Sequence, residues 1–252
     1  MILVTGMHRS GTSLVAMTME ALGVPFGDHA AFYAADQWNA RGYFERRDVM
    51  DVNSRMIAGV GRTSSRLGAL VGQVVYLSEP ELDKILARGR RYADVMLTIR
   101  DQTEDGAIKD PRLCLTWGAW AEVVDIESVV VCIRHPFDVA DSLRRRQHIP
   151  MKLGLRFWRY HTQALRSRLP DKVVIVDLDS LLASPRTELD MLVAALDLDI
   201  DTDDAVRRFH TTYSPGMAKI SPEERPTLDP ATADLWKWVA GLRPIPIVER
   251  TV

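Results

Sequence analysis

A short apolar run at the start of this chain reaches a glycine and then a helical pattern. Residues 2–4 are Ile-Leu-Val, and Gly6 and Gly11 bound the loop that follows. Beyond Gly11, apolar residues recur every three or four positions, as on one face of an amphipathic helix. A strand, a glycine-bounded loop and a helix start in this order predict a phosphate cradle, because loop N–H groups and the helix N-terminus attract an anion.

The loop departs at one position from a well-known phosphate-binding loop. The spacing Gly6-x4-Gly11 is that of the Walker A loop of nucleoside triphosphatases, which needs a lysine directly after the second glycine. Thr12 stands there instead, and Arg9 is the strong cation of the loop. A plain strand, turn and helix without a ligand is the alternative, but glycines, a cation and hydroxyls together at a helix start favour an anion site. The predicted cradle consists of Gly6, Arg9, Ser10, Gly11, Thr12 and Ser13.

Length and composition predict one α/β domain with a few excursions. The chain has 252 residues, of which 46% are hydrophobic and 26% charged, a balance typical of a globular domain. Its net charge of −2 predicts no nucleic-acid partner, since domains that bind nucleic acids are usually basic. No stretch has the length of a membrane span, and the first apolar run is too short for a signal peptide.

The two cysteines, Cys114 and Cys132, lie far apart in apolar stretches and outside any metal-binding spacing. We interpret them as buried thiols of a protein in a reducing compartment. The sequence therefore predicts a cytoplasmic location and no metal site. Nothing in it indicates the oligomeric state.

A second candidate phosphate site follows an apolar run in the middle of the chain. Residues 128–133 predict a strand that is buried on both faces, as in parallel sheets. Arg134 comes directly after it, Pro136 suits the first position of a helix, and Ser142 falls one or two turns into that helix. Ligands bind at the carboxyl ends of parallel strands, so we expect Arg134 and Ser142 to share one phosphate.

Two more apolar runs, residues 106–109 and 172–177, predict further strands. Lys109, Asp110 and Arg112 follow the first of them, and they either gather at the ligand-binding edge of the sheet or form a surface salt-bridge cluster. Strands that alternate with amphipathic helices predict an α/β fold of three layers, with a short central parallel sheet flanked by helices.

Other segments allow two interpretations each. Glu45 stands where a helix should begin. It is either a first-turn carboxylate that complements the helix dipole or a catalytic group. Residues 28–44 suggest a flap beside the site. A long amphipathic helix is predicted from Pro80 to about Ile99. Residues 144–168 hold eight Lys or Arg and no acid. They form either a solvated helix face or a surface that binds an anionic acceptor or a cofactor phosphate.

The two phosphate motifs, in this order, closely resemble those of the sulfotransferase superfamily. The first is Arg-Ser-Gly-Thr-Ser at residues 9–13, where arginine in place of the commoner lysine is typical of a bacterial-type subgroup with the sequence RSGT. The second is Arg134-x-Pro136-x5-Ser142. With further similarity at residues 42–45, 109–112 and 179–182, the resemblance covers about residues 1–190 of a single domain, 1–252. Residues 191–252 would form a C-terminal helical and loop extension.

The resemblance implies a P-loop-like fold and the cofactor 3′-phosphoadenosine 5′-phosphosulfate (PAPS). In this family the first loop binds the 5′-phosphosulfate, which implies that role for Arg9 and Thr12, and the second motif binds the 3′-phosphate, which implies that role for Arg134 and Ser142. The implied reaction transfers a sulfuryl group to a hydroxyl or an amine of a small-molecule, carbohydrate or lipid acceptor. It is catalysed by positioning and charge neutralisation, with Arg9 facing the bridging oxygen.

The chain departs from the family at the general base. The cytosolic animal branch has a catalytic histidine after a Lys-Thr dipeptide, where this chain has Lys109, Asp110 and Pro111. Sulfotransferases outside that branch use a glutamate reached after the first helix, so we predict Glu45 as the base, with His29 and Asp110 as alternatives. His8 is expected to add a hydrogen bond at the loop or to be structural.

Two other functions remain open from the sequence. A P-loop nucleotide kinase that uses ATP is disfavoured by the missing lysine at Thr12. A non-catalytic nucleotide-binding protein with a vestigial loop is disfavoured by the presence of Arg9, Arg134 and Ser142 together.

Overall fold

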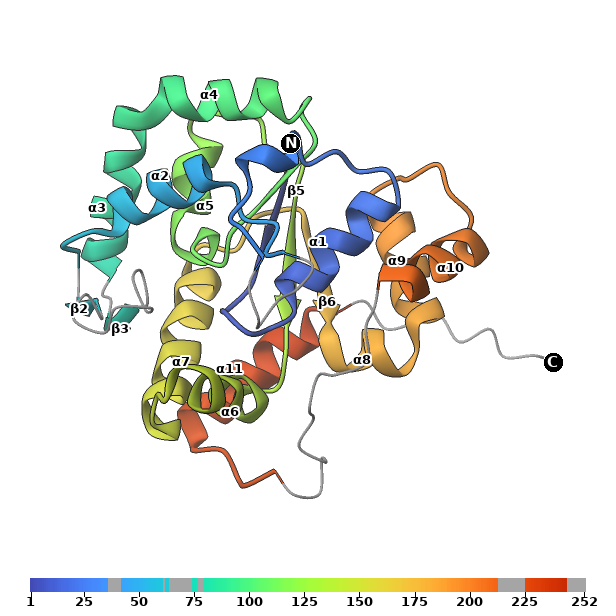
Figure 1. The fold of residues 1–252 in the computed structure, drawn as a ribbon. Helices are drawn as coiled ribbons and strands as arrows, with labels where there is room; N and C mark the ends of the chain where they lie inside the picture. The colour runs from blue at the N-terminus through green and yellow to red at the C-terminus, as the bar shows by residue number, and fades with distance from the viewer. Residues whose placement is uncertain (36–41, 61, 64–73, 77–78, 213–224, 244–252) are drawn as a thin grey trace.

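The computed structural model describes residues 1–35, 42–60, 62–63, 74–76, 79–212 and 225–243 (Figure 1). Its centre is a four-stranded sheet in which all neighbouring strands run parallel. The strands, in spatial order, are β4 (Ala107–Lys109), β1 (Ile2–Thr5), β5 (Ser128–Ile133) and β6 (Val173–Asp177). Because β1 lies between β4 and β5, the loop after β1 opens at the same edge as the ends of both neighbours.

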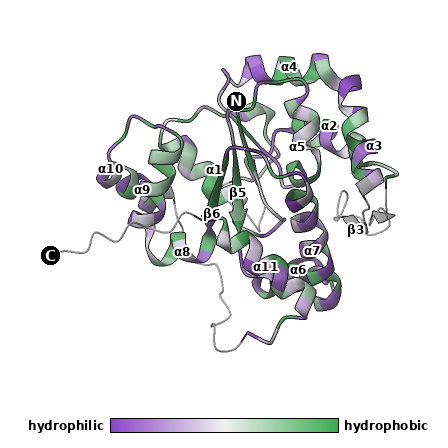
Figure 2. Ribbon diagram, turned by 180° about the vertical axis from the view of Figure 1, so that it is seen from behind, coloured by the Kyte–Doolittle hydropathy of each residue, from purple (hydrophilic) through white to green (hydrophobic). Residues whose placement is uncertain are grey.

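Alternate residues of the strands enter two separate hydrophobic clusters, because side chains point to opposite faces along a strand. Leu3, Val129 and Ile175 belong to the cluster on one face, whereas Val4 and Val130 belong to the cluster on the other. Both faces are therefore covered, as expected for parallel strands that are apolar throughout. In Figure 2 the strands β5 and β6 are green along their length, whereas the surrounding helices mix green with purple.

Helices flank the sheet on both sides and complete three layers (Figure 1). The layer on the Val4 face contains α1 (Thr12–Ala21), α8 (Leu178–Ala183), α9 (Pro185–Ala195) and α10 (Thr202–Thr212). The layer on the Leu3 face contains α2 (Arg47–Ile57), α3 (Glu79–Gly89), α4 (Ala93–Gln102), α5 (Leu113–Ala121), α6 (Pro136–Gln147), α7 (Met151–Ser167) and α11 (Pro230–Gly241). The predicted α/β fold, with a short central parallel sheet between helices, is confirmed.

Shorter elements lie between these helices. The strands β2 (Arg62–Thr63) and β3 (Val74–Tyr76) form an antiparallel pair, and one 3-10 turn, His29–Ala31, follows α1. Another, Arg90–Tyr92, separates α3 from α4.

The helix predicted from Pro80 to about Ile99 is wrong in its continuity, because α3 ends at Gly89 and α4 begins at Ala93. Gly89 packs tightly against α5, where a Cβ on Gly89 would come within 2.6 Å of the Cβ of Ala119. This close approach excludes a side chain, and glycine weakens a helix interior. Gly89 itself is still helical, and the backbone departs from helical geometry at Tyr92, with φ −116° and ψ 14°. Figure 1 shows α3 and α4 running in different directions.

The C-terminal helices contribute to both clusters. Phe209 of α10 lies in the cluster on the Val4 face, whereas Leu235 and Val239 of α11 lie in the other. A division of the domain near residue 190 stays a prediction. In the part of the chain that the structure describes, no helix is both long and apolar enough to cross a membrane.

Gly6 is the position at the end of β1 where the fold leaves no room for a side chain. Its φ is 142°, and a Cβ would lie 2.2 Å from the carbonyl oxygen of Cys132 in β5. We predict that Gly6→Ala lowers the free energy of unfolding by roughly 2–4 kcal/mol, because it strains the backbone and pushes β1 away from β5. Urea unfolding measures this loss.

Gly59→Ala is the matched control for that measurement. Gly59 also has a positive φ, 69°, but an added Cβ would meet no atom within 4 Å. Its substitution should cost only the backbone strain, roughly 1–2 kcal/mol. If Gly6→Ala and Gly59→Ala lost the same unfolding free energy, the close approach of Gly6 to Cys132 would not be the reason that this position requires glycine.

Candidate active site

The loop after β1 and the end of β4 border a cavity of about 390 Å³. The loop and the first turn of α1 contribute His8, Arg9, Thr12 and Ser13 to its wall. Tyr43, Glu45, Lys109, Arg112 and Arg146, from three other segments, also line it. Ligands of open parallel sheets bind at the carboxyl edge of the strands, so this cavity is the candidate active site.

The backbone of the loop leaves the start of α1 open to an anion. Gly6, Arg9 and Gly11 all have positive φ angles, of 142°, 75° and 87°. Gly11 is the N-cap of α1, no side chain caps that end, and the first turn holds no acid. The first N–H groups of a helix have no partner within the helix. They therefore remain available, together with the positive end of the helix dipole, to a negatively charged ligand.

Not every residue of the predicted cradle faces the main cavity. Ser10 lines a second cavity of about 20 Å³ beneath the loop, enough space for about one water molecule. Its hydroxyl has no hydrogen-bond partner among the described residues, and its N–H donates to the Met7 carbonyl at 3.0 Å. Gly11 allows the loop to pass close to α8, because a Cβ at this position would lie 2.6 Å from Cδ1 of Leu178. The side chains that reach the main cavity are those of Arg9, Thr12 and Ser13.

Arg9 joins the first loop to the second motif. Its Nε donates to Ser142 Oγ at 2.9 Å, and Arg134 Nη1 donates to the Arg9 carbonyl oxygen at 3.3 Å. Burial, reinforced by the guanidinium groups of Arg146 and Arg134, lowers the pKa of Arg9 to about 10, so Arg9 is still charged at neutral pH. Such a crowd of cations marks a place that a bound anion would stabilise.

The end of β5 and the start of α6 position the second motif. His135 is the N-cap of α6, where its Nδ1 accepts a hydrogen bond from the Phe137 N–H at 3.3 Å. Pro136 begins the helix, as its fixed φ allows. Arg134 and Ser142 are both buried, and burial lowers the pKa of Arg134.

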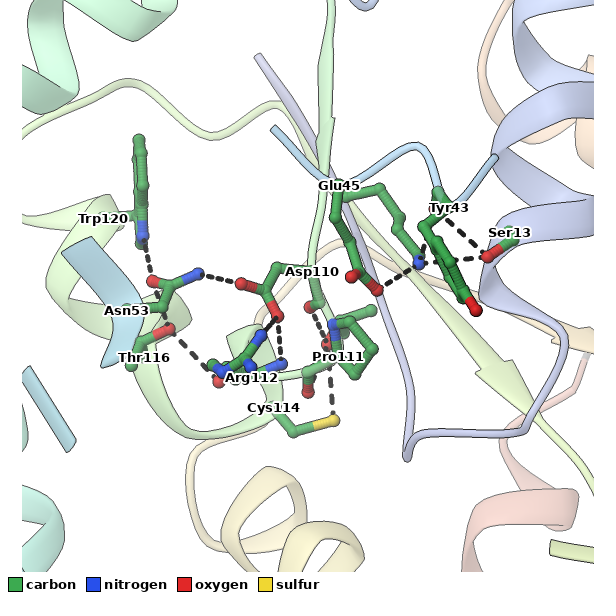
Figure 3. A network of polar contacts seen from close by, with 12 residues as sticks. Ser13, Tyr43, Glu45, Asn53, Asp110, Pro111, Arg112, Cys114, Thr116 and Trp120 are labelled. Carbon is green, nitrogen blue, oxygen red and sulfur yellow. Dashed lines mark hydrogen bonds and ion pairs between the residues drawn. The ribbon is translucent and has the colours of Figure 1, made fainter. Parts of the chain in front are cut away.

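Lys109 is the buried centre of another part of the wall (Figure 3). Its Nζ donates to Glu45 Oε1 at 2.6 Å, to the Tyr43 carbonyl oxygen at 2.9 Å and to Ser13 Oγ at 3.2 Å. Its side chain is 1% exposed. The sequence placed Lys109 at the end of a strand, but it gave no signal that these segments meet there.

Glu45 lines the cavity as half of this ion pair. Because α2 begins at Arg47 and Asp48 is the acid of its first turn, the interpretation of Glu45 as first-turn charge is wrong. Its carboxylate instead lies against Lys109. Among the described residues that line the cavity, Glu45 is the one acid. Its role as the base stays a prediction.

Asp110 and Arg112 belong to a second buried network (Figure 3). The backbone N–H and Nη1 of Arg112 donate to Asp110 Oδ1 at 2.8 and 3.0 Å. Asn53 Nδ2 donates to Asp110 Oδ2 at 3.1 Å. Asn53 Oδ1 accepts from Thr116 Oγ1 and Trp120 Nε1, each at 2.9 Å. Asp110 is 0% and Arg112 7% exposed, so the interpretation as a surface salt-bridge cluster is wrong.

His8 lies in the cavity wall as a neutral imidazole. Burial lowers its pKa well below the usual value, and the charge of Arg112 acts in the same direction. Its Nε2 is buried and has no hydrogen-bond partner within the described part of the chain. The ring packs edge-on against His161, with the ring centroids 6.2 Å apart. A contact of His8 with a cofactor stays a prediction.

The alternative bases lie in less suitable places. His29 does not line the cavity, and its exposed ring pairs with Glu20 at 2.5 Å and stacks on Phe32. Asp110 is held by its own network. Residues 36–41 of the suggested flap lie outside the described residues, whereas Tyr33 and Tyr43 on either side of them line the cavity.

Other sequence candidates are placed outside the cavity. Arg144 and Arg145 of the basic stretch both pair with Asp141, which favours the solvated-face interpretation for them, whereas Arg146 of the same stretch lines the cavity. Cys114 and Cys132 are buried free thiols. No group of three or more His, Cys, Asp or Glu side chains that could hold a metal ion occurs in the residues described here.

No protein-family model matches the sequence, and no curated protein sequence matches it. One solved structure that does match is the sulfotransferase domain of the olefin synthase from Synechococcus PCC 7002. The chain shares the fold of that sulfotransferase domain. The match covers 94% of this chain and 86% of that one, with a TM-score of 0.52 and 19% sequence identity. At this identity the likeness shows the fold alone.

His161, behind His8, predicts a pH-dependent stability. Burial lowers the pKa of His161 from 6.5 to about 4. Between these values the unfolded chain binds more protons than the folded one, so stability is present above pH 6.5 and is lost as the pH falls toward 4. With about 1.4 kcal/mol for each pKa unit, the loss is on the order of 3 kcal/mol.

Urea unfolding of the wild type and of His161→Phe between pH 4 and 7 measures this effect. The variant should show a flatter dependence of unfolding free energy on pH in that window. Some slope should remain, because the pKa of His8 is lowered for the same reason. Identical slopes in the two proteins would contradict the assignment to His161.

Proposed function

We propose that the protein is a sulfotransferase, which transfers a sulfuryl group from PAPS to a hydroxyl or an amine of a small-molecule, carbohydrate or lipid acceptor. The observation that carries this proposal is the contact of Arg9 with both members of the second motif, Ser142 at 2.9 Å and Arg134 at 3.3 Å. The two motifs that the resemblance implies for the two ends of PAPS are therefore neighbours beside the cavity. The fold shared with a sulfotransferase domain agrees with the proposal.

The groups around Arg9 suit the phosphates of PAPS. The uncapped start of α1 and the hydroxyl group of Thr12 offer hydrogen-bond donors to a 5′-phosphosulfate, whereas the hydroxyl group of Ser13 donates to the Tyr43 carbonyl oxygen. Arg134 and Ser142 offer a charged and a neutral donor to a 3′-phosphate. The positive charge crowded around Arg9 would be balanced by such a ligand. The donor set therefore fits this cofactor.

The contact between Arg9 and Ser142 would couple the two phosphate sites. A serine hydroxyl that accepts a hydrogen bond from a guanidinium group still has its own hydrogen to donate, and that donation is strengthened by the charge behind it. Arg9 would thus orient Ser142 toward the 3′-phosphate while its charge serves the 5′-phosphate.

The cavity wall supplies the other requirements of the reaction. When bound, PAPS would supply the sulfuryl group on a phosphate leaving group. Arg9 is proposed to neutralise the charge that develops on the leaving oxygen. Glu45 is proposed to accept the proton of the acceptor hydroxyl. The ammonium group of Lys109 donates to Glu45 and to Ser13, so it fixes the proposed base relative to the first turn of α1.

Two alternatives fit the site less well. An ATP-dependent kinase with this fold needs a lysine on the transferred phosphates and ligands for magnesium, but Thr12 follows the second glycine and Lys109 is paired with Glu45. A non-catalytic nucleotide-binding protein would not need a buried ion pair in the cavity wall. Such a pair costs desolvation energy, which favours an enzymatic role.

Ligand choice tests the proposal without an acceptor. Adenosine 3′,5′-bisphosphate should bind and raise the Tm, since a ligand at a hundred times its Kd adds about 2.7 kcal/mol to stability. ATP with magnesium should raise the Tm much less. Thermal unfolding with each ligand measures the difference. Equal stabilisation by ATP, or a requirement for magnesium, would contradict the proposal.

Arg134→Ala is the matched variant for that experiment. It should lose a charge-assisted contact worth roughly 1.5–3 kcal/mol, and the affinity for the bisphosphate should fall toward that for adenosine 5′-phosphate. Isothermal titration calorimetry with both ligands measures this selectivity. If both ligands weakened equally, Arg134 would have a structural role only.

Glu45→Gln tests the proposed base. The variant should lower turnover by roughly 10²–10⁴-fold, with little change in affinity for adenosine 3′,5′-bisphosphate. Mass spectrometry of reactions with PAPS and pooled hydroxylated compounds measures the turnover. The Tm should also fall, because Lys109 loses its buried counter-ion, so turnover is compared below the Tm of both proteins. Near-normal turnover would exclude Glu45 as the base.

A further inference from the structure

We propose that Arg112 is an oxyanion-binding residue of the cavity and that Asn53 is the residue that positions it. The oxyanion is a sulfate, carboxylate or phosphate group. The inference rests on the proposed function only for the source of this group, which is either the sulfuryl end of the donor or an anionic group on the acceptor.

Arg112 is placed where a ligand can meet it. It is the N-cap of α5 and it lines the 390 Å³ cavity together with Arg9 and Glu45. A guanidinium group has five N–H donors in a rigid fork. One guanidinium group can therefore contact more than one acceptor, and that of Arg112 holds the carboxylate of Asp110 through Nη1 at 3.0 Å.

The network behind Arg112 has a defined direction. Asn53 Oδ1 accepts from two donors, Thr116 and Trp120, which fixes the amide so that its Nδ2 faces Asp110 Oδ2. With Oδ2 held by Asn53 and Oδ1 by Arg112, the carboxylate of Asp110 cannot rotate (Figure 3). Asn53 therefore fixes, together with the backbone N–H of Arg112, the carboxylate on which the Arg112 side chain rests.

This arrangement is expensive for a purely structural role. Asn53, Asp110, Thr116 and Trp120 are each 0% exposed, and apolar residues of similar volume often stabilise a core as well as buried polar ones. Of the network's members, Arg112 is the one whose side chain lines the cavity. The geometry thus serves to aim one guanidinium group at the ligand.

The charge of Arg112 acts on the cavity although Asp110 lies beside it. The guanidinium group contributes to the lowered pKa of His8 and of His161. The charges of Lys109 and Arg9 lower the pKa of His8 in the same direction, with smaller effects than that of Arg112. A negative group in the cavity near His8 would therefore be attracted by Arg112.

A sulfate titration tests the site. Sodium sulfate is added to the protein saturated with adenosine 3′,5′-bisphosphate, which fills the loop, and sodium chloride at equal ionic strength is the reference. The wild type should gain Tm with sulfate beyond the chloride effect. Arg112→Gln should bind sulfate about 10- to 100-fold more weakly, and Arg112→Lys should fall between them because it keeps the charge but not the fork.

The positioning role of Asn53 is measured in the same assay. Asn53→Ala should weaken sulfate binding about tenfold without changing the affinity for the bisphosphate, because Asn53 does not line the cavity. Thr116→Val is the control, since Trp120 still holds the Asn53 amide. General destabilisation would lower the Tm of Asn53→Ala or Thr116→Val, but it would leave the ratio of the sulfate affinity to the bisphosphate affinity unchanged. An unchanged sulfate affinity in Asn53→Ala overturns its positioning role.

Arg112→Gln leaves Asp110 as a buried carboxylate without its counter-ion, which can disturb the fold, so a second variant without this charge is measured as well. Arg112→Met combined with Asp110→Asn removes both charges and should lose the sulfate response in the same way. Sulfate affinity equal to that of the wild type in either Arg112 variant, or no wild-type response beyond chloride, overturns the oxyanion site.

Two further measurements identify the source of the oxyanion. If Arg112 binds the donor, Arg112→Gln should reduce the preference for PAPS over the bisphosphate. If it binds the acceptor, the variant should raise KM for acceptors with a carboxylate or phosphate but not for neutral ones. Either result supports the oxyanion site. If Arg112→Gln shows neither effect, the site is overturned. Failure of the proposed function is distinct: the bisphosphate would not bind at all, while sulfate binding to the free protein would still report on Arg112.

Discussion

A single buried ammonium group holds the candidate site together. Lys109 stands at the end of β4 and donates to Glu45, to the carbonyl oxygen of Tyr43 and to Ser13 of α1. An unpaired buried lysine would cost several kcal/mol, so the contacts of Lys109 favour the arrangement in which these segments meet. This explains the backbone between Tyr43 and Glu45, where Phe44 has a φ of 58°. The turn directs a carbonyl group and, two residues later, a carboxylate to the same nitrogen.

The features that the sequence could predict are those that neighbouring residues encode. An apolar β-branched run needs no partner in order to be recognised as a buried strand, so Ser128–Ile133 was predicted with the bounds that β5 has. Pro136 restricts its own backbone and therefore marks the start of α6. The spacing of Gly6, Gly11 and the helical pattern defines the loop, because backbone geometry is local.

What the sequence could not predict depends on partners far along the chain. Gly89 at the end of α3 packs tightly on Ala119, and the break before α4 comes at Tyr92, but periodicity carries no information about either. Ser10 looks like its neighbours Thr12 and Ser13 in the sequence, yet the turn of the loop directs it into the small cavity beneath. The contact of Arg9 with Ser142 spans 133 positions. Each motif could be recognised alone, but not the bond between them.

The charges of the site fall into two kinds. Lys109 and Arg112 each have a buried carboxylate beside them, Glu45 and Asp110, so the folded chain balances these cations itself. Arg9 forms no ion pair with a carboxylate in the described part of the chain; its side chain donates to the neutral hydroxyl of Ser142, and other guanidinium groups surround it.

That difference separates two cations that already have a carboxylate partner from Arg9, which has none among the described residues. The free protein carries an electrostatic cost at Arg9, which a bound phosphate or sulfate would remove, and part of the binding energy would come from that relief. A local excess of positive charge is compatible with an overall net charge of −2, because the balancing acids lie elsewhere. Selectivity for an anion at this loop therefore depends on keeping carboxylates away from Arg9 as much as on placing the cation there.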